Sequence, residues 1–443
     1  MRLAVIGTGI SGMLAARLLA GDHEVHVFEA GDYVGGHTNT VTVELGGERY
    51  LLDTGFMVFN DRTYPHFVRL LDLLKVPWRK SEMSFSVRCE QTGLEYQGGS
   101  LGGLFAQRRN LLRPSFYRML RDILRFNREA PELLDHEDEG ITLDDYLRDR
   151  RYSQQFIEHY LVPMGASIWS TPPGQFCQFP ARYTVGFFRN HGLLDLRGRP
   201  QWKTVAGGAA RYVEALTLPF ADRIRLNAPV ERVARRPEHV EVTPRGGPPE
   251  VFDCVVMAAH ADQSLAMLAD PSRQEREILA AFPYQANEIV LHTDASLMPR
   301  ARRAWASWNA YLPAEAGRPV TLTYNLNRLQ GHESTEPILE TLNPATPVAP
   351  ARVLWRMTYH HPVYSLASVE AQRRYDEING QRRTYYCGAY WGNGFHEDGV
   401  RSALAVGRCF GKDLQTCIAA SSLGGSITVA FARWHISSAT GSA

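Results

Sequence analysis

The sequence of this 443-residue chain has no surplus of charge and very little lysine. Its 48 basic and 47 acidic residues leave a formal net charge of +1 at pH 7. Because this balance is nearly even, it does not point to nucleic acid as a partner. Only four of the basic residues are lysines, at positions 75, 80, 203 and 412. The stretch between Lys203 and Lys412 therefore has no primary amine in any side chain.

The cysteines form neither a CxxC pair nor a metal-like cluster; they are Cys89, Cys177, Cys254, Cys387, Cys409 and Cys417. Scattered cysteines in a long chain are typical of reduced thiols, so we expect a cytoplasmic protein without a bound metal. No run reaches the roughly 20 apolar residues that span a bilayer. Gly7, Gly9 and Gly12 interrupt the apolar N-terminus, which disfavours a signal peptide.

The N-terminal segment has the order of elements of a dinucleotide-binding unit. An apolar strand at 3–6 leads into the glycine pattern GTGISG at 7–12, and a helical pattern follows at 13–19. A second strand at 24–28 ends at Glu29. This order predicts a parallel βαβ unit whose glycine turn meets a pyrophosphate.

Each residue type in this motif has a physical task. Gly7 permits a tight turn, Gly9 lets the pyrophosphate approach the backbone, and Gly12 lets helix and strand pack closely. The helix N-terminus attracts the phosphates. Glu29 is placed to accept hydrogen bonds from the ribose hydroxyls, and its charge would repel a 2′-phosphate.

The segment after Glu29 distinguishes FAD from NAD. The sequence GGHT at 35–38 is followed by alternating strands at 41–44 and 49–52 and by DTGF at 53–56, instead of further strand–helix units. This arrangement resembles the flavin-containing amine oxidase superfamily, whose signature is GxGxxG, an acid, GG-Arg and a D/E-x-G turn. The resemblance implies FAD, with the glycine pair along the pyrophosphate and the turn close to the flavin ring.

A second flavin motif is expected near the C-terminus. The segment RTYYCGAYWGNGFHEDGVRSAL at 383–404 resembles the superfamily's strand ending in glycine, a loop, and a glycine before a helix. The resemblance implies that this helix begins near Gly399 and Val400. Its N-terminus would then face the flavin C2 carbonyl and stabilise negative charge on the reduced ring.

Three departures from the superfamily pattern bear on the site. His37 stands where the family has arginine, so a fixed positive charge is lost. Ala389 follows the strand-end Gly388 where many relatives have an acid; Glu397 or Asp398 could replace that acid, or either could cap the following helix. Characterised amine oxidases commonly hold a water near flavin N5 with a lysine, and this chain has none between 203 and 412.

By resemblance, the FAD contacts come from both motifs and from one later strand. The implied set is Gly7, Gly9, Ile10, Ser11, Gly12, Glu29, Ala30, Gly35, Gly36, His37, Thr38, Thr54, Gly55, Phe56, Val230, Gly388, Gly399 and Val400. Val230 would give backbone contacts to the adenine, although a plain core valine explains its side chain equally well.

The resemblance spans residues 1 to about 412 and implies an α/β (mixed α+β) fold. In it, a Rossmann-like FAD-binding domain of the glutathione-reductase type carries an inserted mixed substrate domain. We expect the discontinuous FAD-binding domain at 1–62, 200–260 and 381–412, and the substrate-binding domain at 63–199 and 261–380. The tail at 413–443 has no clear period and is expected to be poorly ordered.

Local patterns predict further elements. Helical spacing at 64–74 follows Thr63 as a candidate cap, and 101–190 is expected to be mainly helical, with starts at Pro114, Thr142 and Ser153. We expect strands at 224–226, 230–234, 240–243, 252–257, 288–292 and 320–325, with a hairpin tip at 244–249.

The substrate is suggested by a closer resemblance. The segments at 53–67, 100–114, 188–202 and 390–405 look like a bacterial group of FAD-dependent proteins that are commonly encoded near cyclopropane-fatty-acid-synthase-like methyltransferases. This implies a dehydrogenase or desaturase of an unsaturated or methylated fatty acyl lipid. Two alternatives stay open: a flavin amine oxidase with an altered site, and a non-redox flavin mutase or isomerase.

Few residues are candidates for the reacting face. His396 and Glu397 could move a proton, or they could support the loop that contains them. Tyr390 and Trp391 could line the substrate tunnel beside the flavin, or they could be core aromatics. Weaker candidates are Trp169, Trp305, Trp308, Tyr359 and His360.

One basic stretch suits a membrane surface. Residues 104–126 interleave arginines with Leu, Phe, Met and Tyr, and these arginines are Arg108, Arg109, Arg113, Arg118, Arg121 and Arg125. Such a pattern fits peripheral contact with anionic lipid. A helix with a solvated arginine face and a core face is the commoner origin of the same pattern. The oligomeric state is left open.

Overall fold

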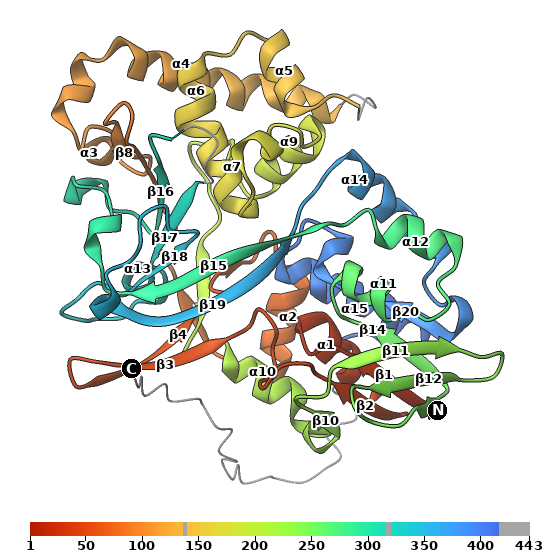
Figure 1. Cartoon of the computed structure of the whole chain (residues 1–443). Coiled ribbons are helices and arrows are strands. Elements are labelled where there is room, and N and C mark those ends of the chain that lie inside the picture. Colours follow the sequence, from red (N-terminus) through yellow and green to blue (C-terminus); the bar gives the residue numbers. More distant parts are fainter. Residues whose placement is uncertain (136–139, 316–319, 416–443) are drawn as a thin grey trace.

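The structure is a computed structural model that describes residues 1–135, 140–315 and 320–415 (Figure 1). A five-stranded parallel sheet in the order β10-β2-β1-β14-β20 contains the predicted dinucleotide motif. Its strands are β1 (Arg2–Ile6), β2 (Glu24–Phe28), β10 (Ile224–Arg225), β14 (Cys254–Met257) and β20 (Thr384–Tyr386). The near-continuous apolar runs of β1 and β14 suit strands that are covered on both faces.

Helices cover one face of this sheet and a three-stranded meander covers the other. The helices α1 (Ile10–Leu19), α10 (Ala210–Thr217) and α15 (His396–Cys409) share a core with Leu3 and Val5. Ala4 and Ile6 point the other way, into a core shared with the meander. The elements on that side are β11 (Val230–Arg235), β12 (Val240–Pro244), β13 (Glu250–Phe252), α11 (Ala261–Met267) and α12 (Arg273–Leu279).

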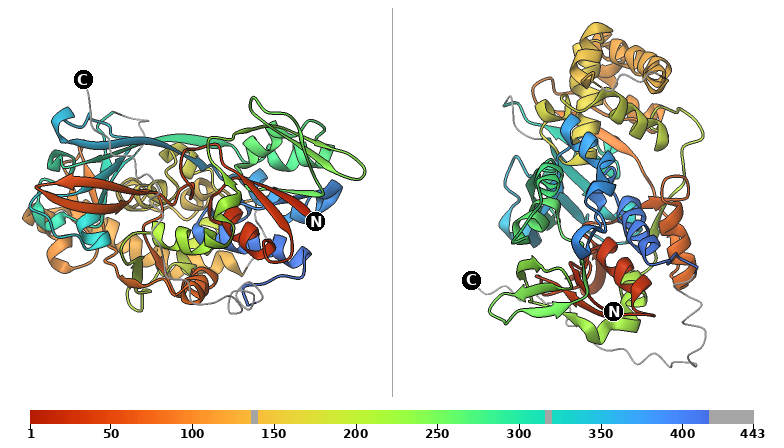
Figure 2. Two further views of the ribbon diagram at one scale, coloured as in Figure 1. Left: turned by 90° about the horizontal axis from the view of Figure 1, so that it is seen from below. Right: turned by 90° about the vertical axis from the view of Figure 1, so that its right-hand side faces the viewer.

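A seven-stranded mixed sheet lies beside the parallel sheet, in the order β19-β15-β18-β17-β16-β7-β8. Its strands are β7 (Phe85–Cys89), β8 (Glu95–Gln97), β15 (Tyr284–His292), β16 (Trp308–Leu312), β17 (Thr321–Asn325), β18 (Leu339–Leu342) and β19 (Val353–Pro362). The long strands β15 and β19 run side by side from this sheet toward α12 and α14 (Leu366–Arg373), as Figures 1 and 2 show.

A helical region lies beyond one end of the seven-stranded sheet, at the top of Figure 1. It consists of α3 (Leu101–Leu104), α4 (Pro114–Glu129), α5 (Leu143–Asp149), α6 (Gln154–Phe156), α7 (Val162–Trp169), α8 (Pro173–Phe176) and α9 (Ala181–Asn190). The predicted starts are confirmed: Pro114 opens α4, and the hydroxyls of Thr142 and Ser153 accept hydrogen bonds from the first turns of α5 and α6. None of the helices within the described residues is both long and apolar enough to cross a bilayer.

Smaller elements connect these parts. They are the hairpin β3 (Thr40–Leu45) and β4 (Glu48–Asp53), the three-stranded sheet of β5 (Phe59–Asn60), β9 (Trp202–Val205) and β6 (Trp78–Lys80), and the helices α2 (Pro65–Leu74) and α13 (Leu326–Gln330). The hairpin and α13 pack on the seven-stranded sheet, whereas α2 packs on α15 and α10. They therefore hold the two large sheets beside each other.

Several local predictions needed correction. The strand predicted at 252–257 is two strands in different sheets, because the chain turns at Asp253 from β13 into β14. Thr63 does not cap α2; Tyr64 is the N-cap residue, and its side chain makes no capping hydrogen bond. The domain boundaries stay a prediction. Of the predicted tail at 413–443, the residues after 415 lie outside the described part of the chain.

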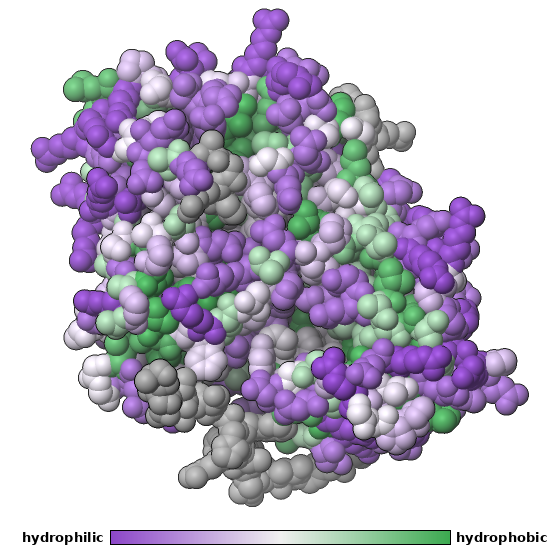
Figure 3. Space-filling view, viewed as in Figure 1, coloured by the Kyte–Doolittle hydropathy of each residue, from purple (hydrophilic) through white to green (hydrophobic). Residues whose placement is uncertain are grey.

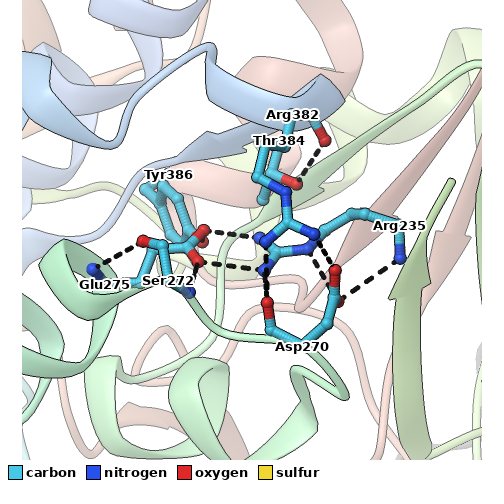
Figure 4. A network of polar contacts seen from close by, with 7 residues as sticks. All are labelled: Arg235, Asp270, Ser272, Glu275, Arg382, Thr384 and Tyr386. Atoms are coloured by element: carbon cyan, nitrogen blue, oxygen red, sulfur yellow. Dashed lines mark hydrogen bonds and ion pairs between the residues drawn. The ribbon is translucent and has the colours of Figure 1, made fainter. Parts of the chain in front are cut away.

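A buried polar network ties the meander to α12 and β20 (Figure 4). The Arg235 guanidinium contacts Asp270 at 3.0 Å and Glu275 at 2.5 Å, and the Tyr386 hydroxyl donates to Glu275 at 2.6 Å. Burial would raise the pKa of Glu275, but hydrogen bonds from Arg235 and Tyr386 outweigh it and lower the pKa to about 2. Ser272 N–H also donates to this carboxylate. Glu275 is thus ionised and fully paired.

Candidate cofactor and active site

The N-terminus of α1 has the geometry of an anion site. Its N-cap, Gly9, makes no side-chain capping bond, and a Cβ atom on Gly9 would meet nothing within 4 Å. A Cβ atom on Gly12 would lie 2.0 Å from the Gly7 carbonyl oxygen, so this helix can approach β1 only with glycine there. The open space in front of the uncapped N–H groups fits a pyrophosphate.

Glu29 lies half-buried at the end of β2, beside this space. Its carboxylate accepts hydrogen bonds from Thr8 N–H at 2.9 Å, from the Thr8 hydroxyl and from Gly31 N–H at 2.8 Å. Ala228 N–H donates to the Glu29 carbonyl at 2.8 Å, so the chain that leads into Val230 runs next to Glu29. A carboxylate can accept about four hydrogen bonds, so about one acceptor position is left for a ribose hydroxyl.

The two predicted flavin segments near the N-terminus are in direct contact. Phe56 N–H donates to the His37 carbonyl at 2.9 Å, and a Cβ atom on Gly55 would lie 2.1 Å from that oxygen. Thr54 Oγ1 lies 3.0 Å from the Tyr359 hydroxyl, which belongs to β19. The segments 35–38 and 54–56 therefore form one surface against the seven-stranded sheet.

His37 differs in kind from the arginine of the superfamily. Its ring stacks on Tyr359 at 4.7 Å and lies 5.3 Å from His361. Burial lowers the pKa of His37 to about 4, and the neighbouring His260 and His360 add to this fall. The imidazole is neutral, and its buried Nε2 atom has no hydrogen-bond partner within the described residues. One ring nitrogen is thus free for a ligand.

His396 is the first residue of α15, and its ring stacks on Phe56 at 3.6 Å. Its Nε2 atom lies 2.7 Å from the Tyr212 hydroxyl and 3.0 Å from Thr38 Oγ1. Burial lowers the pKa of His396 to about 3, so the ring is neutral at physiological pH. The fold thus brings together the predicted residues Thr38, Phe56 and His396, and Tyr212 of α10, which was not among the predicted residues, completes their hydrogen bonds.

The carboxylates of the two acids after His396 accept hydrogen bonds from backbone N–H groups. Glu397 accepts hydrogen bonds from the N–H groups of His66 and Phe67 at 3.1 and 3.0 Å, and so caps α2. Asp398 accepts from Asn393 and Phe395 N–H at 3.0 and 3.1 Å, just before α15. The contacts of Asp398 favour the predicted cap of the following helix, α15, whereas Glu397 caps α2 instead.

The helix start in this motif was predicted three residues too late. α15 begins at His396, and Gly399 lies one turn in, where a Cβ atom would be 2.7 Å from Ile10 Cγ2. Gly399 therefore lets α15 approach α1, and Val400 is fully buried. Gly388 N–H donates to Ser402 Oγ at 2.9 Å, which ties the strand end to the same helix.

Tyr390 and Trp391 lie away from His396. Their rings pack on Phe282 at 5.1 and 5.6 Å, and Trp391 also packs on Tyr375 at 4.8 Å. Both belong to the core between the parallel sheet, the meander and α12, whereas Phe56 belongs to the core on the opposite face. This placement favours the interpretation of Tyr390 and Trp391 as core aromatics.

One face of the seven-stranded sheet looks toward the flavin segments; we call it the inner wall. The strand register places on this face the side chains of Ile289, Leu291, Trp308, Ala310, Leu322, Tyr324, Glu340, Leu342, Trp355, Met357 and Tyr359. The polar residues Gln285, Asn287 and His361 lie on the same face, at the end of β15 and β19 beyond Tyr359. Met57 and Val58, which follow the predicted flavin turn, share an apolar cluster with Leu291 of this wall. The wall therefore lies opposite the segment at 54–58.

Of the weaker candidates, Trp308 and Tyr359 lie on the inner wall. Trp169 lies in the helical core, Trp305 donates its indole N–H to the Pro299 carbonyl, and His360 is exposed on the other face of β19. None of the chain's lysines lies on the wall, because Lys203 pairs with Asp61, Lys412 pairs with Asp22, Lys75 ends α2 and Lys80 lies on β6. All four lysines lie within the described residues.

Glu340 is the wall residue that sequence reasoning missed. It is 1% exposed, and neither of its carboxyl oxygens has a partner within the described residues. Burial raises the pKa of Glu340 well above its ordinary value, and the charge of Asp53 adds to the rise. A lone acid in the apolar run at 338–342 was the only signal in the sequence, and it did not reveal which side chains lie across from it.

Comparison with known proteins decides the family. The model of flavin-containing amine oxidoreductases matches residues 10–302. The chain belongs to this family. Over 350 residues it is 28% identical to AofH of Mycobacterium tuberculosis, which is assigned as a flavin-containing monoamine oxidase; the match covers 73% of this chain and 70% of that protein. The protein is accordingly an FAD-dependent oxidoreductase.

Solved structures with a similar fold were also found. Cyclohexylamine oxidase from Brevibacterium oxydans superimposes with a TM-score of 0.64 at 16% identity, covering 92% of this chain and 99% of that one. A fatty acid isomerase from P. acnes that produces CLA gives the same TM-score and identity, covering 92% and 98%. At these identities the likeness shows the mixed α/β fold with its Rossmann-like FAD-binding domain.

The residues present fit FAD. The uncapped α1 N-terminus suits the pyrophosphate, and Glu29 keeps about one acceptor position for a ribose hydroxyl. His37 Nε2 is a buried polar atom without a partner among the residues that the structure describes. These groups are contributed by segments that are distant in the sequence but contiguous in the fold. The geometry thus supports the cofactor that the family implies.

Proposed function

We propose that this oxidoreductase removes hydrogen from an unsaturated or methylated fatty acyl chain. The observation that carries the proposal is the inner wall, whose mainly aromatic and aliphatic side chains face the predicted flavin segments. No lysine or arginine of the described strands lies on this face. An acyl chain gains about 0.8 kcal/mol for each CH₂ group that it buries on such a surface.

Bound FAD supplies the redox chemistry by accepting two electrons from the substrate. The chain positions the neighbouring groups: Tyr212 and Thr38 hold the His396 ring against Phe56. The histidines at 37 and 396 are neutral, since burial lowers the pKa of both. These buried, neutral rings suit an uncharged carbon chain, and their burial keeps water away from it.

The test is anaerobic reduction of the holoenzyme by methylated and unsaturated fatty acids and by phospholipids that contain them. We expect the flavin absorbance to bleach and the product to be two mass units lighter, because two hydrogen atoms leave the chain. His396→Ala with flavin bound should slow this reduction; normal reduction would remove His396 from the mechanism. A product of unchanged mass would indicate an isomerase instead.

Amine oxidation is the second candidate, and the likeness to AofH favours it. The absence of a lysine from the inner wall weighs against it, because characterised relatives commonly use one near the flavin. Release of hydrogen peroxide on addition of alkyl or aryl amines, with no response to acyl lipids, would replace the first proposal by this one.

We also propose that the segment 104–126 contacts an anionic lipid surface. It is not one helix but the end of α3, a short turn at 108–112 and the first part of α4. Leu111, Leu112 and Leu124 are 50%, 87% and 53% exposed, and Arg118 and Arg121 are exposed among them. Figure 3 shows hydrophilic side chains over much of this upper region, with smaller apolar patches between them.

Vesicle pelleting tests this surface. Vesicles with anionic phospholipid should retain the wild type, and Arg118→Glu with Arg121→Glu should release it, because each charge reversal loses about 1 kcal/mol or more of surface attraction. Arg232→Glu with Arg245→Glu, on the exposed meander, is the matched control. Equal retention of both double variants, or no retention of the wild type, would contradict the proposal.

A further inference from the structure

We propose that Glu340 holds the polar end of the substrate, and that its protonated carboxyl group donates a hydrogen bond to an acyl carbonyl oxygen. This inference rests on the proposed function and names the residue that recognises the head of the acyl chain. The argument depends on where Glu340 lies, on its lack of partners, and on the chemistry of its neighbours.

Glu340 lies in the middle of a cross-strand row on the inner wall. On one side, Leu291 of β15 pairs with Glu340, and Trp355 of β19 pairs with Leu291. On the other side, Tyr324 of β17 pairs with Glu340, and Trp308 of β16 pairs with Tyr324. Directly paired residues point to the same face of a sheet, so the whole row faces the flavin segments.

Three polar groups of this row have no hydrogen-bond partner among the described residues. They are the carboxyl group of Glu340, with both of its oxygens, and the indole N–H groups of Trp308 and Trp355. Buried polar groups in native proteins are nearly always paired, and exceptions call for an explanation. Among these three groups, the Glu340 carboxyl group at the centre of a row that faces the predicted flavin segments points to a ligand.

The chemistry of the row selects the ligand. An indole N–H can only donate a hydrogen bond, and a protonated carboxyl group donates one as well. The row therefore presents donors and fits a group that is rich in acceptors, such as the carbonyl of an acid or an ester. Each indole lies two strands from Glu340, so a head group bound at Glu340 meets the carboxyl group itself. An alkylammonium group has only donors and cannot accept the hydrogen bond that a protonated carboxyl group donates.

The electrostatic surroundings agree with a neutral carboxyl group. Asp53 is the charged neighbour that acts on Glu340, and it disfavours a second negative charge. No arginine or lysine of the described strands lies on this wall to compensate such a charge. Glu340 thus differs from Glu275, whose carboxylate is paired with Arg235.

The experiment compares two substitutions at one position in the flavin-loaded enzyme. Glu340→Gln keeps the size and an N–H donor, whereas Glu340→Leu keeps the size and removes the donor. Glu288→Gln, an exposed acid on the outer face of β15, is the matched control. The probes are cis-octadecenoic acid, its methyl ester and the amine of the same chain length, and calorimetry measures their binding.

We expect Glu340→Leu to bind the acid and the ester about tenfold more weakly, and Glu340→Gln to stay within about threefold of the wild type. Trp308→Phe, which keeps a ring but loses an N–H that lies two strands from Glu340, should change the binding of the same two probes less than Glu340→Leu does. A preference for the ester over the acid identifies lipid-bound chains as the source, and the reverse identifies free acids. Unchanged binding in Glu340→Leu overturns the proposal, and so does a wild type that prefers the amine and loses it in Glu340→Gln.

Failure of this inference can be told apart from failure of the proposed function. If acyl chains are dehydrogenated but Glu340→Leu leaves KM unchanged, the function stands and the role of Glu340 falls. If the acid and ester bind through Glu340 but no acyl chain reduces the flavin, the recognition stands and the reaction falls. Thermal unfolding of both variants verifies that they are folded.

Discussion

Glu275 and Glu340 are buried to the same degree, yet the protein holds them in opposite ways. Glu275 receives hydrogen bonds from Arg235, Tyr386 and Ser272 and is ionised (Figure 4). Glu340 receives none from the described residues and is neutral. The first arrangement joins the meander to α12 and β20, whereas the second leaves hydrogen-bonding capacity on a wall. Burial alone therefore does not reveal a site; the balance of partners does.

The largest expected effect is on the paired side. Glu275→Gln removes the more deeply buried of the two carboxylates that compensate Arg235, whose side chain is 1% exposed. Breaking a buried ion pair from one side costs about 3–5 kcal/mol of unfolding free energy, so thermal unfolding should shift down by several degrees. Glu241→Gln, in an exposed pair with Arg236, is the control and should not shift it. Equal unfolding temperatures of the two variants would show that the buried Glu275 pair adds no more stability than an exposed pair.

The pH dependence of stability sharpens the same comparison. The folded-state pKa of Glu275 is lowered from 4.5 to about 2, so its stabilisation is present above its unfolded pKa and is lost as the pH falls toward 2. The shift corresponds to about 3 kcal/mol. Melting temperatures between pH 7 and pH 3 should fall more steeply for the wild type than for Glu275→Gln. Parallel curves would contradict the assignment of this carboxylate as ionised and paired.

A smaller effect is expected at the hydrogen bonds of His396. Tyr212 is fully buried, and its hydroxyl contacts both His396 and Thr38. Tyr212→Phe should lower the unfolding free energy by about 1–3 kcal/mol, because it removes two hydrogen bonds from buried polar groups. Denaturant unfolding measures this loss against Tyr117→Phe on the exposed side of α4. Equal losses would mean that the His396 contacts add no stability.

The smallest stability effect is expected at Glu340 itself. Glu340→Leu replaces an unpaired polar group by an apolar one of similar size, which should leave the melting temperature unchanged or raise it by an amount worth about 1 kcal/mol. Calorimetric melting of the ligand-free variant checks this. A clear loss of stability would show that Glu340 supports the fold, and the contrast with Glu275 would then disappear.

The features that could be predicted are those that depend on residues close together in the sequence. The order of strand, glycines, helix and acid located the α1 site, and the pattern of caps placed the starts of α4, α5 and α6. It could not show that Glu397 caps α2, because the donors lie about 330 residues away and meet it only in the folded chain. Glu340 escaped for the same reason: its meaning depends on the register of strands that the sequence does not specify.

The long strand β19 has a consequence for selectivity. Trp355 lies in the row of Glu340, and Tyr359 lies beside His37, so the same strand touches both ends of the site. Four residues of extended chain span about 13 Å. In an acyl chain anchored at Glu340, the carbon that lies beside His37 would therefore be set by the fixed length of this strand. The position of dehydrogenation would depend on the distance from the head group and not on the substituents of the carbon. Substrates of different length beyond that carbon would then react at the same position.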